Sequence, residues 1–278
     1  MLQQTGEGSW SEPTGRDPTV KTVERVARIL KGLAGGGISG WRLTDLALHV
    51  GLGKPTVHRL LSALIENGLA FQDTGTRRYH PGASLAMMGA AATAISVATG
   101  AVQCLKRLAN ATDDTVYVSI PEGTAAICVG REVGAFPIRT LTLDVGDRRP
   151  LGVGSGSLAL LAAMTDAQAE AALDRNREWL LSYPGFEPDV LRTKVHETRV
   201  QGYALNRGAI VPAMSALGVA VLSPMGKPIA AFSVAAITER IVGRVATLIA
   251  LLRNEAATLN RLLYLEVEQQ RKKEGADE

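Results

Sequence analysis

Residues 43–79 read LTDLALHVGLGKPTVHRLLSALIENGLAFQDTGTRRY, and this stretch decides how the N-terminal part of the chain folds. Its segments 43–50 and 57–64 each carry apolar residues at the i, i+3, i+4, i+7 spacing of one helix face. Gly51 lies in the break between them and can take the positive φ of a tight turn. Two short helices with matching apolar faces and such a break must pack at a steep angle, so the stretch predicts a helix-turn-helix.

The second helix carries hydrogen-bond donors on the face opposite its apolar residues. None of the residues on that face is acidic. The donors that could reach phosphates or base edges are Lys54, Thr56, His58 and Arg59. We therefore expect this helix to be a recognition helix that contacts double-stranded DNA.

A β-hairpin is predicted directly after the recognition helix. Asn67-Gly68 is a helix C-terminus signal. A strand at 69–72, a turn at 73–75 and a return strand that carries Arg77 and Arg78 are expected to follow. A basic hairpin in this position is a wing, which contacts the DNA backbone or the minor groove. The alternative is a winged helix that is used only for protein contacts.

The charge of the chain is distributed unevenly. Residues 19–82 contain nine Lys/Arg and four Asp/Glu, whereas residues 83–278 contain twenty of each. An overall net charge of +3 says little by itself. A basic excess confined to the winged-helix segment is typical of a module that binds the phosphate backbone.

Length and composition indicate more than one domain, since a chain of 278 residues is several times longer than a winged-helix domain. The expected organisation is a disordered tail at 1–18, the winged helix-turn-helix at 19–82, a linker and dimerisation helix at 83–100, an effector-binding domain at 101–268 and a second disordered tail at 269–278. Cys104 and Cys128 form neither a disulfide framework nor a CxxC metal site, so we expect buried thiols in a reducing cytoplasm. The N-terminus lacks the basic start and apolar run of a signal peptide.

One stretch, residues 81–105, contains no charged side chain and is long enough to span a bilayer. Small residues dominate it, however, so it would gain little from lipid, and we expect no membrane partner. The pair Thr99-Gly100 predicts a break between two helices. A stripe suited to close helix–helix packing is formed by Leu85, Met88, Ala92 and Ile95. We therefore expect an interdomain helix that pairs with its copy in a dimer.

Past residue 101 the pattern alternates hairpins with helices. Strands are expected at 115–120, 125–129, 138–143, 216–222 and 229–235, and helices at 102–109, 158–163, 166–176, 187–202 and 238–265. Consecutive hairpins with helices before, between and after them predict an antiparallel sheet flanked by helices. The expected fold class is therefore α+β, with a winged helix-turn-helix at the N-terminus.

The glycine-rich run LGVGSGS at 151–157 precedes the helix at 158–163. Glycines let the backbone approach a ligand, and a helix N-terminus offers free N–H groups to a carboxylate or phosphate. The same pattern also serves as a tight connection that binds nothing. No Gly-Lys-Ser/Thr follows, and Ser155 lacks glycines at both −2 and +2, so neither a P-loop nor a nucleophile elbow is present. We expect no catalytic set, no metal and no cofactor.

Three motifs in order resemble the IclR family of bacterial transcriptional regulators: LTDLALHVGLGKPTVHRLLSALIENGLA at 43–70, GDRRPLGVGSGSLALLAA at 146–163 and GYALNRGAIVPAMSALGVAVLSPMGKPIAAFSV at 202–234. The resemblance spans roughly residues 20–265. It implies a winged helix, a linker helix and a GAF-like effector domain. It also implies homodimers or homotetramers that bind palindromic operators and sense small metabolites bearing a carboxylate or an aromatic ring.

The resemblance further implies which residues surround the effector. They are Gly154, Ser155, Gly156, Asn206, Ser215 and Ser233. Hydroxyls, an amide and helix N–H groups favour a small organic acid held by neutral donors rather than by an ion pair. The sequence departs from the family at Arg42, where a capping Ser or Thr is usual, at Asn206, where many relatives have an acid, and near Ala216, where many have a cysteine.

The leading interpretation is a cytoplasmic, ligand-responsive regulator of a catabolic or metabolic operon, and not an enzyme. The alternative is a winged-helix enzyme such as a small-molecule methyltransferase, in which GVGSGS would be the nucleotide turn. The acid that should hold the ribose there falls at Asp174, in a helical run rather than at the end of a strand. A parallel sheet would favour the enzyme, and an antiparallel sheet would favour the sensor.

Overall fold

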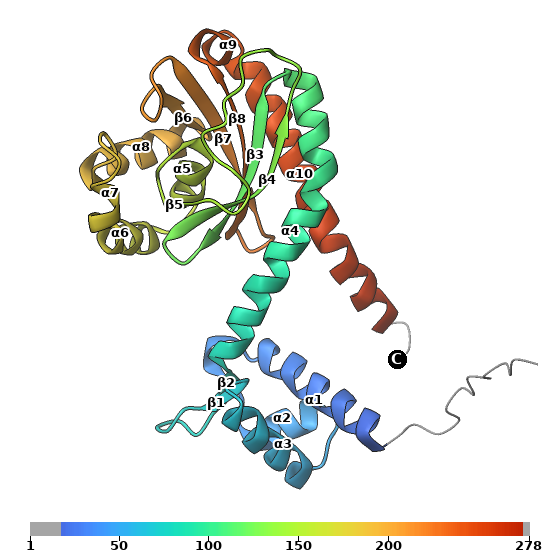
Figure 1. Cartoon of the computed structure of the whole chain (residues 1–278). Helices are drawn as coiled ribbons and strands as arrows, with labels where there is room; N and C mark the ends of the chain where they lie inside the picture. The colour runs from blue at the N-terminus through green and yellow to red at the C-terminus, as the bar shows by residue number, and fades with distance from the viewer. Residues whose placement is uncertain (1–17, 275–278) are drawn as a thin grey trace, which may run out of the picture. The chain divides into compact units, whose positions relative to one another are not determined.

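The structure is a computed structural model that describes residues 18–274. The chain divides into two compact units, one ending at Ala91 and the other beginning at Ala92 (Figure 1). Of the two expected tails, residues 1–17 and 275–278 lie outside the described residues. The last helix continues to Glu274, through most of the stretch where the second tail was expected.

The first unit is the helix-turn-helix that the sequence predicts. Its elements are α1 (Pro18–Gly35), η1 (Gly37–Ser39), α2 (Leu43–His49), α3 (Lys54–Glu66), β1 (Ala70–Gln72) and β2 (Tyr79–Pro81). The predicted apolar faces form its core, in which Leu46 and Val57 are fully buried against Ile29 of α1. Gly51 has a φ of 62°, as the turn requires. The start of α2 has no side-chain cap at Arg42, as expected.

The hairpin after α3 pairs β1 with β2 antiparallel, and Phe71 lies opposite His80. Helix α3 ends at Glu66 with Asn67 as its C-cap, and Gly68 has a φ of 68°, which confirms the predicted stop. Strand β2 is shorter than expected, because Arg77 and Arg78 precede it. The wing is therefore a short ladder with a basic loop in front of its second strand.

Helix α4 (Ala83–Thr112) is continuous, so the break expected at Thr99-Gly100 is wrong. Gly100 is instead a close-approach position, since a Cβ there would lie 3.1 Å from Leu259 Cδ1. In the described part of the chain, α4 is the single helix long and apolar enough to cross a membrane, with a mean hydropathy of 1.7. This property rests on length and composition alone, and one such helix is weak evidence for a membrane span.

The second unit is built on one six-stranded antiparallel sheet in the order β5-β4-β3-β8-β7-β6. The strands are β3 (Thr115–Glu122), β4 (Ala125–Val133), β5 (Arg148–Pro150), β6 (Ala204–Arg207), β7 (Met214–Leu222) and β8 (Pro228–Ile237). All neighbouring strands pair antiparallel. The predicted α+β class is confirmed, and the parallel sheet of the enzyme alternative is absent from the described residues.

Two layers of helices cover the sheet (Figure 1). The C-terminal part of α4 and α10 (Val245–Glu274) pack on one face, where Val116 and Phe232 are fully buried. The other face carries α5 (Ser155–Ala162), α6 (Asp166–Arg175), α7 (Arg177–Leu180) and α8 (Pro188–Gln201), with α9 (Thr238–Val242) following β8. Because side chains alternate along a strand, Tyr117 and Ser119 lie on the α5 side of β3.

The elements of the second unit differ from the sequence predictions at several places. No strand forms at 138–143, which is an irregular segment instead. Strands β5 and β6 were not expected. Helix α5 begins at Ser155 rather than at 158. The last predicted helix is split at Gly243 into α9 and α10.

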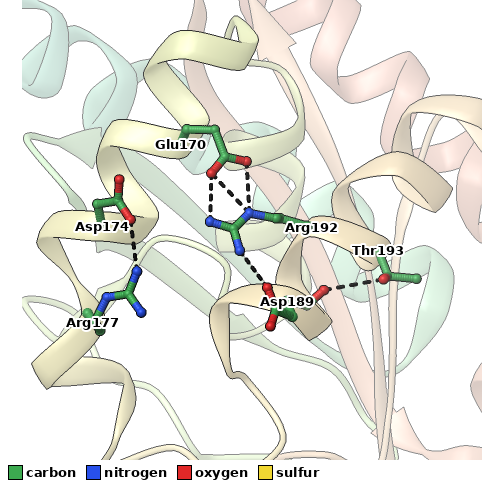
Figure 2. Close-up of polar contacts among 6 residues, drawn as sticks. All are labelled: Glu170, Asp174, Arg177, Asp189, Arg192 and Thr193. Atoms are coloured by element: carbon green, nitrogen blue, oxygen red, sulfur yellow. Dashed lines mark hydrogen bonds and ion pairs between the residues drawn. The ribbon is translucent and has the colours of Figure 1, made fainter.

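Charged side chains link α6 and α8 (Figure 2). Arg192 of α8 donates to Glu170 of α6 at 2.8 Å and to Asp189 at 2.6 Å. The Glu170 carboxylate, followed by Asp189, raises the pKa of Arg192 above its usual range. Arg199 donates to the carbonyl of Ala162 at 2.8 Å and so caps the end of α5. The Arg199 contact ties α8 to α5, whose first turn borders a cavity described below.

Candidate functional site

The predicted DNA-contacting face of α3 is exposed and free of acids. Lys54, His58 and Arg59 are exposed, and Thr56 is half-buried. The opposite face carries Val57 and the leucines of the core. Among residues 18–274, no acidic side chain pairs with Lys54 or Arg59. The face therefore presents its donors outward, in the arrangement that a major groove accepts.

The two wing arginines differ in their surroundings. Arg77 is exposed and has a φ of 58°. Arg78 is half-buried, and its Nη1 donates to the carbonyl of Gly40 at 2.9 Å and to that of Ser39 at 3.4 Å. Arg78 thus ties the wing to the segment before α2. The sequence did not reveal this contact, because its acceptors are backbone atoms far away in the chain.

A cavity of about 70 Å³ lies on the α5 side of the sheet, between α5, the irregular segment 138–143, the end of β6 and the start of β7. It has space for a few water molecules or a small organic molecule. All the predicted effector residues line it, namely Gly154, Ser155, Gly156, Asn206, Ser215 and Ser233. The structure therefore gathers residues from four separate elements into one site.

The glycine-rich turn shapes one end of the cavity. Gly152 and Gly154 have φ values of 101° and 91°, which disfavour any residue with a side chain. The Ser157 hydroxyl accepts from Gly152 N at 3.0 Å and donates to Pro150 O at 3.1 Å, so it locks the turn. At Gly156 a Cβ would lie 3.2 Å from Ser233 Oγ. The absence of a side chain there brings the start of α5 close to β8.

Several polar atoms at the cavity have no partner among the described residues. The hydroxyls of Ser119, Ser155 and Ser233 are in this position, and Thr140 Oγ1 is fully buried without a hydrogen bond. Asn206 Oδ1 accepts from Ala209 N at 3.2 Å, which leaves its Nδ2 as a donor. Ser215 differs, because its hydroxyl is paired with Thr238 Oγ1 at 2.9 Å.

Among the cavity residues that the sequence prediction did not name are Tyr117, Thr140, Thr142 and Arg149. Tyr117 forms an aromatic wall, and its hydroxyl donates to the carbonyl of Thr140. Burial raises the pKa of Tyr117 to about 12, so it remains a neutral donor. Arg149 adds a permanent positive charge to a lining that the sequence predicted to offer neutral donors. Its position could be recognised only through β5, which was not predicted.

Comparison with known proteins assigns both units. Residues 22–74 match the IclR helix-turn-helix domain, and residues 89–261 match the bacterial transcriptional regulator IclR C-terminal domain. The chain belongs to the IclR family of bacterial transcriptional regulators. The resemblance stated from the three sequence motifs is confirmed.

Similar IclR-family proteins match over nearly their whole length. The HTH-type transcriptional regulator Rv1719 of Mycobacterium tuberculosis is 29% identical over 242 residues, covering 86% of this chain and 91% of the relative. The crystal structure of a putative IclR-family regulator from Rhodococcus sp. has a TM-score of 0.67 at 22% identity, covering 91% of this chain and 98% of that one. An IclR homologue from Microbacterium hydrocarbonoxydans, complexed with 4-hydroxybenzoate, has a TM-score of 0.54 at 19% identity, covering 88% and 99%.

This IclR-family chain is therefore a DNA-binding transcriptional regulator of the helix-turn-helix type. Its relatives are named regulators and not enzymes, so the methyltransferase alternative has no support. In the part of the chain that the structure describes, no three His, Cys, Asp or Glu side chains gather as a metal site requires.

Proposed function

We propose that this regulator senses a small organic acid in the cavity beside α5 and binds a palindromic operator as a homodimer or homotetramer in the cytoplasm, controlling a catabolic or metabolic operon. The observation that carries the proposal is the set of unpartnered donors around the cavity, above all the buried Thr140 hydroxyl. Buried polar groups are nearly always hydrogen-bonded, so such donors point to a polar guest.

The effector class follows from the chemistry of the donors. Hydroxyls, the Asn206 amide and the first N–H groups of α5 suit a carboxylate, and Tyr117 suits a flat or apolar body beside it. The 4-hydroxybenzoate complex of the Microbacterium homologue combines these two features in one molecule. We therefore place aromatic acids first among the candidates, with Gly154, Ser155, Gly156, Asn206, Ser215 and Ser233 as contacts.

In the DNA-bound form, Arg59 and Thr56 contact base edges in the major groove, flanked by Lys54 and His58. Arg77 contacts phosphates from the wing. Arg78 positions the wing through Gly40 and contacts phosphate with its remaining N–H groups, since a guanidinium has five. Residues 19–82 act as the DNA-binding domain.

The second copy pairs through α4. In the proposed linker 83–100, Met88 and Ile95 are 59% and 69% exposed, and Ala92 between them is also exposed, whereas Leu85 is half-buried. An exposed apolar stripe on a long helix calls for a partner. One winged helix contacts half of a two-fold site, so a second copy of this helix is the partner that operator binding requires, rather than a bilayer. Residues 101–268 then form the effector-binding domain.

A thermal-shift screen tests the site. Small aliphatic and aromatic acids, including 4-hydroxybenzoate, are added to the wild-type protein, to Ser155→Trp, which fills the cavity, and to Ser182→Trp, a surface control outside it. We expect an acid to stabilise the wild type and the control but not the filled variant. The same acid should alter operator affinity in a gel shift. An acid that stabilises Ser155→Trp equally would place the effector elsewhere.

A further inference from the structure

The charge at the cavity comes from a single residue. Of the described residues that line it, Arg149 alone is charged. Arg149 lies in β5, opposite Ala126 of β4, and is half-buried. Its Nη1 lies 3.6 Å from the point where a Cβ on Gly154 would stand. The guanidinium therefore lies beside the residue that precedes α5, at the end of the cavity where the helix begins.

Most of the hydrogen-bonding capacity of Arg149 is unused. A guanidinium has five N–H groups, and the one acceptor that the described residues offer it is the carbonyl of Thr142. The preceding residue, Arg148, points away, as alternate residues of a strand do, and pairs with Glu122 at the surface. Two adjacent arginines thus have different roles, and only Arg149 faces the cavity.

Two other features of the cavity could contribute to binding an acid beside Arg149. The first turn of α5 presents backbone N–H groups with a partial positive charge. Thr140, from the irregular segment across the cavity, keeps a buried hydroxyl without a partner. A cationic fork beside a helix N-terminus matches the two oxygens of a carboxylate, and the Thr140 hydroxyl offers a hydrogen bond to a further polar group of the same molecule.

We propose that Arg149 anchors the carboxylate of the effector by an ion pair and so makes the cavity selective for acids over neutral molecules of the same shape. This inference rests on the proposal that the cavity holds the effector. Because Arg149 also holds the Thr142 carbonyl, the bound acid is linked through one guanidinium to the segment that covers the cavity. Arg131 holds the same segment at the Leu143 carbonyl, at 3.2 Å, and at Asp144, at 3.4 Å.

The test compares acids with their own amides. Propionate, lactate and benzoate are titrated calorimetrically into the full-length protein beside propionamide, lactamide and benzamide, which keep the shape and lose the charge. Wild type is compared with Arg149→Gln, Arg149→Lys and the neighbouring control Arg148→Gln. We expect at least one acid to bind, and its Kd to rise roughly 10- to 100-fold in Arg149→Gln, to recover in part in Arg149→Lys and to stay unchanged in Arg148→Gln.

The outcomes separate this inference from the proposed function. An acid that binds Arg149→Gln as tightly as wild type, or no more tightly than its amide, overturns the anchor. If Ser155→Trp still abolishes that binding, the cavity remains the effector site and only Arg149 loses its role. Failure of every acid to bind the wild type also overturns the anchor. Equal melting temperatures of Arg149→Gln and Arg148→Gln exclude misfolding as the cause of lost affinity.

Discussion

Replacing Asp114 with Asn should lower the free energy of unfolding of the second unit by about 2–4 kcal/mol. The Asp114 side chain is fully buried, and its oxygens pair with Arg240 Nε at 2.9 Å and with Arg244 Nη2. Removing one partner of a fully buried ion pair costs about 3–5 kcal/mol, because a buried charge is left alone. The two arginines are 25% and 32% exposed, so water screens part of that charge and the expected loss is smaller.

The same cluster fixes the segment that leads to the cavity. Gly134 N donates to the Asp114 carbonyl at 3.1 Å, and Arg240 lies over the Phe136 ring at 3.8 Å. Asp114→Asn should therefore also loosen this end of the segment, which then continues to Thr140. Limited proteolysis should show faster cleavage between residues 134 and 147 in the variant.

Asp174→Asn is the matched control, because Asp174 has an arginine partner at the surface. It pairs with Arg177 at 3.1 Å, and both side chains are at least 60% exposed (Figure 2). Exposed pairs contribute about 0–1 kcal/mol. Urea titration followed by circular dichroism measures both variants, and an unchanged m-value shows that only stability has changed. Equal losses in the two variants would refute the argument from burial.

Three further predictions address DNA binding, assembly and pH. Arg59→Ala should cost about 1–3 kcal/mol of operator-binding free energy and relax the sequence preference. Arg77→Ala should weaken binding to all DNA sequences alike and lower the salt dependence of binding by about one unit of slope. Wild-type affinity of both variants in gel-shift titrations would contradict the proposed DNA contacts. Ala92→Glu should break the proposed dimer or weaken operator binding. A variant that sediments as a dimer and binds the operator like wild type would show that the dimer interface lies elsewhere. Burial raises the pKa of the Cys104 and Cys128 thiols from 9.0 to about 11 in the folded protein. The neutral buried thiols therefore contribute fully to the free energy of unfolding below pH 9, and this contribution is lost as the pH rises toward 11. Cys128→Ala should flatten that decline in urea titrations, and an unchanged decline would assign it to other groups.

The helix-turn-helix was predictable because its signals are local. The apolar spacing, the positive φ of Gly51 and the Asn67-Gly68 stop all depend on residues within a few positions of one another. Gly100 shows the opposite case. A glycine in a helix pattern suggests a break, yet here it admits Leu259 from α10, a contact between residues far apart in the chain. The helix propensity of glycine alone could not distinguish a helix break from a close approach between two helices.

The lining of the cavity was predictable where a single sequence motif supplies it, but not where contacts between distant residues supply it. The turn at Gly154 and Ser155 could be recognised from the sequence because glycines precede a helix. The segment 138–143 alternates polar and apolar residues as a strand would, but it forms no ladder. Tyr117 binds its Thr140 carbonyl and Arg149 its Thr142 carbonyl, so side chains satisfy backbone groups that strand pairing would otherwise use.

The unpartnered hydroxyls set a limit on which molecules the cavity can accept. A buried donor or acceptor without a partner costs about 1–3 kcal/mol. An apolar guest of the right size would leave Thr140 unpaired and would shield the Ser119 and Ser233 hydroxyls from water without giving them a partner, and this cost opposes what burial of a small apolar surface contributes. A guest with a carboxylate at the Arg149 end and a second polar group near Thr140 would satisfy them instead. Selectivity then arises from the cost of unpaired protein groups as well as from the attraction of the ion pair. A competing molecule that lacks the carboxylate or the second polar group leaves a polar group of the protein without a hydrogen-bond partner and therefore binds more weakly.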